Sequence, residues 1–361
     1  MKISDYYTYA PKSKIKAGDA NPNGKYQFYT SSPDESRRCD EYLYDCKAIV
    51  MGTGGSATLH YYDGKFSTST DCLTLIPNEK IRAKYLYYFF LANMGVLEAG
   101  FKGAGLKHTS KGYIDNIEIT KIPSLPSQDK IVNLFDELAL RIEKERRQIE
   151  KLDELIKARF VEMFGDRFLN TMNWPTKKLG DCATFRNGKA HEKVISETGQ
   201  YVLITSRAIA SDLQDVRHTD SLLTPLATGD IVMVMSDVPN GKALAKCLLI
   251  TENEKYTLNQ RICSLSNYDL NPVFFTYLLN RHQFFLSFND GNGQTNLRKD
   301  DILNCPLIRP SIELQNQFAN FVAQVDKSKF VLSNKLTMCD FYIRLIHDRV
   351  MHGRINLRVT Q

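Results

Sequence analysis

The sequence lacks several features that identify metal-binding, secreted and membrane proteins. Its eight cysteines are scattered and no two form a C-x-x-C pair, so a zinc ribbon is not expected. No apolar run reaches the length of a membrane-spanning helix, and Met1 leads directly into a polar segment rather than a secretory signal. These absences predict a cytoplasmic protein with reduced thiols and no membrane partner.

Motifs for nucleotide hydrolysis, metalloproteolysis and adenine methylation are also missing. The glycine run at residues 52–56 lacks the P-loop pattern G-x-x-x-x-G-K-[ST], so we expect a tight turn or bulge there. His191 and Glu192 are not followed by the second histidine of a zinc-protease motif. Residues 271–274 read Asn-Pro-Val-Phe and lack the second proline of the methyltransferase motif N-P-P-F. We therefore interpret Pro272 as the first residue of a helix.

One loose enzyme pattern is present. A metal-dependent nuclease needs two carboxylates on the metal and a lysine near the attacking water, and Asp34, Asp45 and Lys47 fit this requirement. The pattern has no counterpart in the second half of the chain, and the serines around Asp34 favour a turn. No metal or cofactor site is predicted, and the nuclease is kept as an alternative function.

The composition itself is ordinary for a folded protein. The chain has 361 residues, 43% of them hydrophobic, so two globular domains can each bury a core. The formal net charge of +6 is compatible with a nucleic acid partner without requiring one. Function therefore has to be inferred from the organisation of the chain.

The most informative feature is an internal repeat. Residues 123–128 read Pro-Ser-Leu-x-x-Gln, and residues 310–315 read Pro-Ser-Ile-x-x-Gln, 187 positions later. Residues 2–5 (Lys-Ile-Ser-Asp) similarly return at 178–181 as Lys-Leu-Gly-Asp. A duplicated chain builds two similar surfaces related by a pseudo-two-fold. Such a protein suits a partner with two-fold character, of which duplex DNA is the commonest.

Each copy is predicted to form an α/β (α+β) unit in which short apolar strands, separated by Gly, Asn and Asp, precede a helix. The first copy has expected strands at Tyr26–Tyr29 and Ala48–Met51 and a helix near Tyr85–Met94. The second has expected strands at Tyr201–Ile204 and Ile231–Val234 and a helix at Phe274–Arg281.

A long helix is expected after each unit. The first runs roughly from Ser124 to Phe164 and the second from Ser311 to His352, and each follows a Pro-Ser pair that suits a helix N-cap. Gly165 has the position of the residue that follows a helix end, as does Gly353 in the second copy. At 1.5 Å per residue, each helix could span about 60 Å.

Both helices carry the same apolar seam, with alternating spacings of four and three residues. The predicted seam comprises Leu138, Ile142, Ile149, Leu152 and Ile156 in the first helix and Val325, Leu332, Leu336, Ile343 and Ile346 in the second. Glu145 and Lys329 occupy polar positions of this seam. We expect antiparallel pairing within one chain, because the partner helix is always present at high effective concentration. Homodimerisation through the seam is an alternative.

The ordered set of motifs resembles a known family. Two units that open with K-[IL]-x-D and close with P-S-[IL]-x-x-Q into a long helix look like the specificity subunit of type I restriction–modification systems. Residues 174–181, Trp-Pro-x-x-Lys-Leu-Gly-Asp, are similar to the start of a target recognition domain in that family. Residues 152–166 resemble its central spacer helix. The resemblance covers nearly the whole chain, although the first copy lacks the tryptophan.

The resemblance implies a division into parts. Two target recognition domains, at 1–123 and 166–310, would be joined by spacer helices at 124–165 and 311–353, with a tail at 354–361. Each domain would read one half of a split double-stranded DNA target, and the helices would set the gap between the halves. Two methyltransferase subunits would dock and methylate adenine at N6, and restriction subunits would cleave unmethylated DNA. The chain itself would be non-catalytic; a helical protein-interaction scaffold is a further alternative.

DNA contacts are expected at three places that recur in both copies. Base readout needs side chains with paired hydrogen bonds on loops or element ends, and phosphate contacts need nearby Lys, Arg, Ser or Thr. The first place comprises Thr30, Ser31 and Ser32, aligned with Thr205, Ser206 and Arg207. The second comprises Lys65, Ser67 and Ser69, within residues 65–70 aligned with 256–261, where the candidates are Asn259, Gln260 and Arg261. The third comprises Lys107 and His108, within residues 105–109 aligned with 295–299, where the candidates are Asn296, Arg298 and Lys299.

The equivalent places keep hydrogen-bonding character but differ in residue identity. Two readers of different half-sites are expected to differ in this way. The third place is the strongest candidate, because glycines on both sides free the backbone for close approach to DNA.

Overall fold

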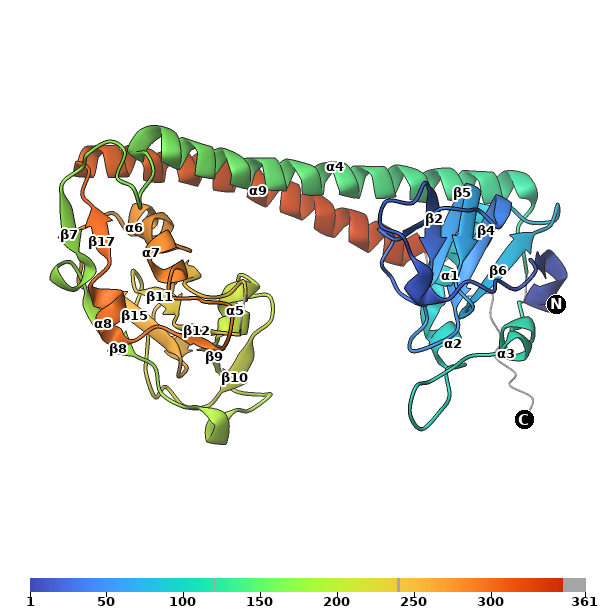
Figure 1. Ribbon diagram of the computed structural model, residues 1–361, viewed down its shortest axis with the longest axis horizontal. Coiled ribbons are helices and arrows are strands. Elements are labelled where there is room, and N and C mark those ends of the chain that lie inside the picture. The colour runs from blue at the N-terminus through green and yellow to red at the C-terminus, as the bar shows by residue number, and fades with distance from the viewer. Residues whose placement is uncertain (120, 239–240, 347–361) are drawn as a thin grey trace. The chain divides into compact units, whose positions relative to one another are not determined.

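The computed structural model describes residues 1–119, 121–238 and 241–346 (Figure 1). The end of the second expected helix, with Gly353 and the expected tail 354–361, lies outside the described residues. The chain divides into two compact units: the first contains Met1–Arg147 and the residues from Leu332 onward, and the second contains Gln148–Val331. Each unit therefore combines one β-rich domain with a part of both long helices.

The first domain contains a six-stranded sheet in the order β1-β6-β4-β5-β2-β3. Its strands are β1 (Tyr7–Tyr9), β2 (Tyr26–Tyr29), β3 (Arg38–Cys39), β4 (Tyr44–Gly52), β5 (Leu59–Thr68) and β6 (Cys72–Pro77). Neighbouring strands are antiparallel, except that β2 and β5 run parallel. The helices are α1 (Ala83–Ala92), α2 (Met94–Glu98) and α3 (Lys111–Asp115).

Strand β4 is buried on both faces of this sheet over its second half. Ile49 and Met51 contribute to a core cluster with Phe89 of α1, whereas Val50 packs with Phe66 in a second cluster. Because successive side chains of a strand point to opposite faces, one short apolar run supports both clusters. The apolar residues thus determine where the strands lie, and the polar segments that are candidates for binding come at the strand ends.

The second domain repeats this order with smaller sheets: β13-β11-β15-β8, β10-β9-β14, β12-β16 and β17-β7. The strands are β7 (Thr176–Lys178), β8 (Thr184–Asn187), β9 (Tyr201–Ile204), β10 (Arg217–Thr219), β11 (Ile231–Val234), β12 (Ser236–Asp237), β13 (Cys247–Leu249), β14 (Tyr256–Leu258), β15 (Ile262–Ser266), β16 (Thr295–Asn296) and β17 (Pro306–Ile308). The helices are α5 (Ser206–Ala210), α6 (Pro272–Leu279), α7 (Gln283–Leu286) and α8 (Lys299–Leu303).

The two domains correspond element by element. The pair β9 and β14 is parallel, as is the pair β2 and β5, and β11 lies beside β15 as β4 lies beside β6. Helices α6, α7 and α8 follow in the order of α1, α2 and α3. The predicted fold class, two similar α/β domains in one chain with two long helices, is confirmed.

The repeated K-[IL] motif closes each domain on itself. The Ile3 backbone N–H donates to the carbonyl of Ile117 over 2.9 Å, and Leu179 donates equally to Cys305. Beside these bonds, the amine of Lys2 donates to Asn116 Oδ1 at 2.8 Å, and the amine of Lys178 contacts Asn304 in the same way at 3.0 Å. The segments that enter and leave a domain therefore lie side by side in both copies.

The long helices α4 (Leu125–Phe164) and α9 (Ile312–Ile346) begin directly after the two Pro-Ser pairs. Gly165 ends α4 with a φ of 75°, a left-handed conformation that favours glycine. Pro272 occupies the first turn of α6, and the Asn271 side chain accepts the Val273 and Phe274 N–H groups. The N-P-V-F segment is thus a helix cap, as predicted.

The two helices pair in antiparallel orientation. In the second unit, Ile156 and Phe160 of α4 share a core cluster with Phe318 of α9, and the amine of Lys329 donates to Asp153 Oδ1 at 2.6 Å. In the first unit, Lys335 Nζ lies 3.9 Å from Glu145 Oε1. The contacting residue number in α4 thus decreases from 153 to 145 as that in α9 increases from 329 to 335, which is the pattern of antiparallel helices. All ten predicted seam residues are buried or half-buried, so the seam is occupied within the chain.

Candidate nucleic-acid interface

The first predicted contact place differs between the copies. Thr30 is only 3% exposed, so burial removes it from the candidates. The Ser31 hydroxyl donates to the carbonyl of Asp71 and accepts from Thr53 N at 3.0 Å, which ties the end of β2 to the glycine run. Ser32 is half-buried, and its hydroxyl accepts from the backbone N–H of Asp34 at 3.2 Å. In the first copy, Ser31 and Ser32 therefore mainly stabilise the loop that follows β2.

In the second copy, the same place carries helix α5. The Thr205 hydroxyl accepts from Ala208 N at 3.1 Å and caps the helix. This leaves Ser206 and Arg207 exposed, with Arg207 Nε 3.5 Å from the carboxylate of Asp215. A cap followed by exposed donors suits a surface that contacts a phosphate or a base edge.

The second place requires a correction. Ser67 and Ser69 are fully buried, because β5 continues through Ser67 and pairs with β2. The Ser67 hydroxyl donates to the carbonyl of Glu41 at 2.8 Å and accepts from Leu43 N at 2.9 Å. Lys65 remains exposed, with its amine 4.7 Å from the centre of the Tyr42 ring. At the second place, Lys65 is therefore the one predicted residue of the first copy that remains a candidate contact.

The alignment of this place is also shifted by one residue. Phe66 pairs with Gln27 in β2, and Tyr256 pairs with Val202 in β9, so Phe66 corresponds to Tyr256 rather than to Thr257. A shift of one residue exchanges the two faces of a strand, which is why the sequence alignment placed buried serines beside exposed polar residues.

The candidates of the second copy at this place follow β14. Asn259 is half-buried, and no hydrogen bond is found for its buried Oδ1. Gln260 and Arg261 are exposed, and the Gln260 amide donates to the carboxylate of Glu192. Arg261 has a φ of 66°, so it marks a tight turn between β14 and β15.

The third place is built from a short bridge between two strand ends in each copy. Gly54 pairs with His108 in the first domain, and Ser236 of β12 pairs with Asn296 of β16 in the second. His108 therefore corresponds to Asn296, two residues away from the sequence alignment, and this correspondence also matches Gly103 with Gly291 and Gly105 with Gly293. We call these two bridges the platforms.

The predicted residues of the third place are all exposed. Lys107 and His108 are exposed in the first domain, as are Asn296, Arg298 and Lys299 in the second. Arg298 precedes α8, and its backbone N–H donates to Asp301 Oδ2 at 2.8 Å, while its side chain is exposed. A hollow of about 520 Å³ adjoins the second platform and is lined by Gln294, Asn296, Arg298 and their neighbours.

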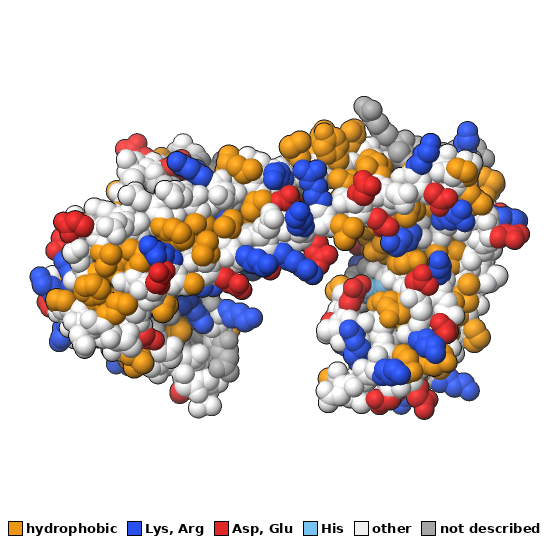
Figure 2. All heavy atoms as spheres, turned by 90° about the horizontal axis from the view of Figure 1, so that it is seen from above, with side chains coloured by type: hydrophobic (Ala, Val, Ile, Leu, Met, Phe, Trp, Pro, Cys, Tyr) orange, Lys and Arg blue, Asp and Glu red, His pale blue; other side chains and the backbone are white. Residues whose placement is uncertain are grey.

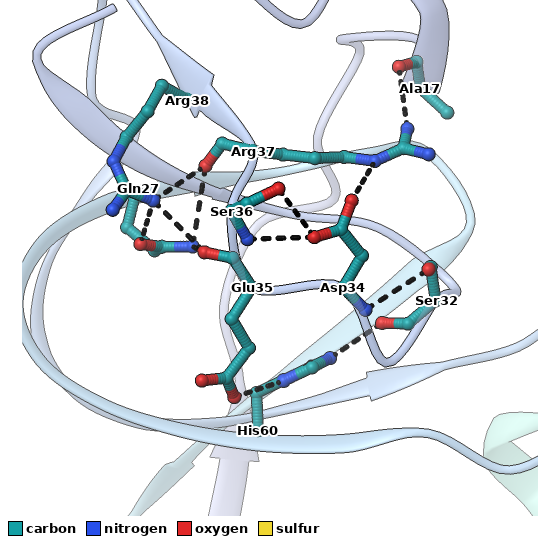
Figure 3. Close-up of polar contacts among 9 residues, drawn as sticks. All are labelled: Ala17, Gln27, Ser32, Asp34, Glu35, Ser36, Arg37, Arg38 and His60. Carbon is teal, nitrogen blue, oxygen red and sulfur yellow. Dashed lines mark hydrogen bonds and ion pairs between the residues drawn. The ribbon is translucent and has the colours of Figure 1, made fainter. Parts of the chain in front are cut away.

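The nuclease pattern is not assembled as a metal site. The Asp34 carboxylate accepts from the Ser36 backbone N–H at 2.9 Å and from its hydroxyl at 2.6 Å, and it lies 3.5 Å from Arg37 (Figure 3). These hydrogen bonds lower the pKa of Asp34. Lys47 forms an ion pair with Asp63 at 3.5 Å. Within the ranges that the structure describes, no group of three His, Cys, Asp or Glu side chains could hold a metal ion.

The face drawn in Figure 2 carries charges of both signs. Figure 2 shows Lys and Arg side chains interspersed with Asp and Glu over the face that it presents.

The repeated glutamine has a structural role that was not predicted from the sequence. Gln128 Nε2 donates to the carbonyl of Pro123 at 2.9 Å, and Gln128 Oε1 accepts from the backbone N–H of Arg82, just before α1, at 2.7 Å. Gln315 makes the same two bonds at 2.9 Å, to the carbonyl of Pro310 and from the N–H of Asn271. The recurrence of glutamine at an offset of 187 is the signal that could have identified this joint.

Each glutamine thus fastens the start of a long helix to the first helix of its own domain. Both side chains are buried, with 0% and 3% exposed for Gln128 and Gln315. Beside them, Arg82 forms a two-pronged ion pair with Asp129 at 2.7 and 3.0 Å, where the second copy has the Asn271–Asn316 hydrogen bond. These hydrogen bonds fix the orientation of each domain relative to the start of its own long helix.

Three solved structures are similar to this chain over nearly its whole length. A solved S subunit of a type I restriction–modification system from M. genitalium is 16% identical, covers 96% of this chain and 94% of its own, and has a TM-score of 0.59. A chain from a structure on complex assembly and conformational transition of the type I R-M system is 13% identical, with 97% and 96% coverage and a TM-score of 0.49. The HsdS subunit from Thermoanaerobacter tengcongensis is 14% identical, with 98% and 96% coverage and a TM-score of 0.38.

No match is found among curated proteins. Among the described residues, no helix is long and apolar enough to cross a membrane. The type I restriction modification DNA specificity domain matches twice, over residues 1–154 and 172–337, which together span most of the sequence. Specificity subunits of these systems recognise DNA sequences and are non-catalytic. The chain therefore belongs to the family of type I restriction modification DNA specificity proteins.

Proposed function

We propose that this protein reads a bipartite double-stranded DNA target in the cytoplasm and directs adenine-N6 methyltransferase and restriction subunits to it. The observation that carries this proposal is the pair of platforms. Gly54–His108 and Ser236–Asn296 share their backbone pairing but differ in side chains. One scaffold with two sets of donors and acceptors suits the recognition of two different half-sites.

The paired helices suit a spacer between the two half-sites. Two cross-helix ion pairs, Lys329 with Asp153 and Lys335 with Glu145, involve the polar positions of the seam. Polar residues within an apolar seam disfavour alternative registers, because a shift would leave them buried without partners. A fixed register gives a constant gap between the halves of the target.

Docking of two methyltransferase subunits requires an exposed protein-binding surface. In the first unit, Met338, Phe341 and Tyr342 on α9 are 55%, 61% and 46% exposed, whereas the seam residue Ile343 is half-buried. Clustered exposed Met, Phe and Tyr side chains are typical of protein interfaces. We assign this cluster, the apolar α9 face, to a methyltransferase subunit.

The test is methylome sequencing in the host or in a heterologous strain. The chain is expressed with a candidate adenine methyltransferase subunit from the same genome, and N6-methyladenine is mapped. The expected result is a split motif with methylation in both halves that disappears when the chain is omitted. Methylation that is independent of this chain, or confined to one undivided motif, would contradict the proposal.

A further inference from the structure

We propose that the platform of the second domain reads an adenine through Gln294 and Asn296, which are held in position by Ser236. This inference rests on the proposed function, because it names the base that one recognition domain selects. It starts from three polar side chains at the edge of the 520 Å³ hollow beside β12 and β16.

The three side chains form a directed hydrogen-bond chain. Gln294 Nε2 donates to Ser236 Oγ at 2.7 Å, and Ser236 Oγ donates to Asn296 Oδ1 at 2.6 Å. Ser236 is 9% exposed, whereas Gln294 and Asn296 are exposed. In this arrangement the hydroxyl accepts from one amide and donates its single proton to the other, so the two amides turn opposite groups toward it. A single buried hydroxyl thus organises two surface amides.

The orientation leaves a defined pair of groups for a ligand. Gln294 Oε1 remains an acceptor, and Asn296 Nδ2 remains a donor, with only a long 3.4 Å bond to the carbonyl of Gln294. In the major groove, adenine presents the N6 amino donor beside the N7 acceptor, which this pair complements. Guanine presents two acceptors, O6 and N7, so O6 would face Gln294 Oε1 without a proton between them.

The surroundings favour a base edge over a phosphate. The hollow is also lined by Asp290 and Asp301, whose carboxylates accept from the backbone N–H groups of Asn292 and Arg298 at 3.0 and 2.8 Å. Two carboxylates in the lining repel a phosphate beside the amides, whereas the exposed Arg298, which also lines the hollow, can contact a neighbouring phosphate. An added Cβ at Gly293 would meet no atom within 4 Å, so the turn leaves open space for a base pair to approach.

The first domain does not repeat this arrangement. Gly54 replaces the organising serine, and His108 replaces Asn296, with an imidazole carbon 3.3 Å from the place where a Cβ on Gly54 would lie. An imidazole beside a glycine does not supply the same acceptor and donor pair. The adenine contact is therefore specific to one half-site.

The experiment compares methylomes directed by full-length variants in complex with the methyltransferase. Gln294→Ala and Asn296→Ala should each relax one adenine position in one half-site, raising use of the other purine there roughly tenfold or more, in line with a lost bidentate base contact. Gln294→Arg should shift that position toward guanine, because arginine pairs with O6 and N7. Ser236→Ala should relax the same position without removing a contacting amide.

The matched control is His108→Ala, which should alter only the other half-site. Gln294 and Asn296 are exposed, so their truncation leaves the core intact, and co-purification with the methyltransferase verifies each variant. A split motif that stays unchanged in all four platform variants overturns the adenine assignment and leaves the proposed function standing. A wild-type chain that directs no split motif overturns both.

Discussion

At the scale of single residues, the second domain contains a histidine whose protonation is suppressed by its surroundings. His282 is completely buried and caps α7, with its Nδ1 accepting from Phe284 N at 3.2 Å. Burial, followed by the nearby charge of Arg167, lowers the pKa of His282 from 6.5 to about 4. The first copy has Asn93 at the corresponding position, before α2. The neutral ring is therefore part of the fold of one copy only.

This histidine makes the stability of the second domain depend on pH. Between about pH 6.5 and 4, the unfolded chain takes up a proton that the folded chain refuses, so the free energy of unfolding should fall as the pH falls through this window, by about 3 kcal/mol. His282→Asn should keep a capping oxygen and flatten this dependence. Denaturant unfolding at pH 7 and pH 4.5 measures both slopes; parallel slopes for the two proteins would contradict the assignment.

Two exposed cations next to the second platform should contact phosphates. Arg298→Ala and Lys299→Ala should each weaken DNA binding by the assembled complex and reduce the slope of log affinity against log salt by about one. Titrations by fluorescence anisotropy at several salt concentrations test this. Unchanged affinity and slope in both variants would remove these residues from the interface.

At the scale of elements, apolar patterns were sufficient to predict the main parts of the fold. The strands at Tyr26–Tyr29, Tyr201–Ile204 and Ile231–Val234 are observed with the expected bounds, and both long helices begin within one residue of the expected start. Strand β5 was not predicted, because its first half is rich in Tyr, His, Asp and Gly and does not resemble a buried strand. Pairing with β4 and β2 decides its structure.

The candidate site was less predictable than the fold for the same reason. Ser67 is polar and lies two residues after the charged Lys65, so sequence alone favours an exposed loop. Its burial follows from strand pairing over a long sequence separation, which local patterns do not encode. The Ser236–Asn296 bridge was equally invisible, because it joins residues 60 positions apart. Residues that recur between the two copies, such as Gln128 and Gln315, indicated structural contacts better than local patterns did.

The glutamine joint gives a prediction for the helices. Gln315→Leu should leave the Pro310 carbonyl and the Asn271 N–H buried without partners, and destabilise the second domain by about 1–3 kcal/mol for each lost bond. Gln317→Leu, on the exposed side of the same turn, is the matched control and should have little effect. Urea unfolding of the full chain compares the two; equal midpoints would show that the joint is not a stabilising contact.

At the scale of the whole molecule, the proposed function depends on assembly with catalytic partners. Phe341→Asp should prevent stable co-purification of a methyltransferase subunit, because a carboxylate would be buried in the apolar α9 face. The control is Leu140→Asp, which replaces an exposed leucine of α4 outside the apolar α9 face and should co-purify normally. Pull-down from a co-expression strain, with thermal unfolding of each free variant, separates lost docking from lost folding. Retention of the partner by Phe341→Asp would place docking elsewhere.

The adjacency of the entering and leaving segments in each domain has an evolutionary consequence. Since Ile3 is bonded to Ile117, and Leu179 to Cys305, a recognition domain can be exchanged between its two flanking motifs without altering the length of any connection. Recombination between related genes within these short motifs would create new combinations of half-sites in a single event, while the helices and their partners stay unchanged.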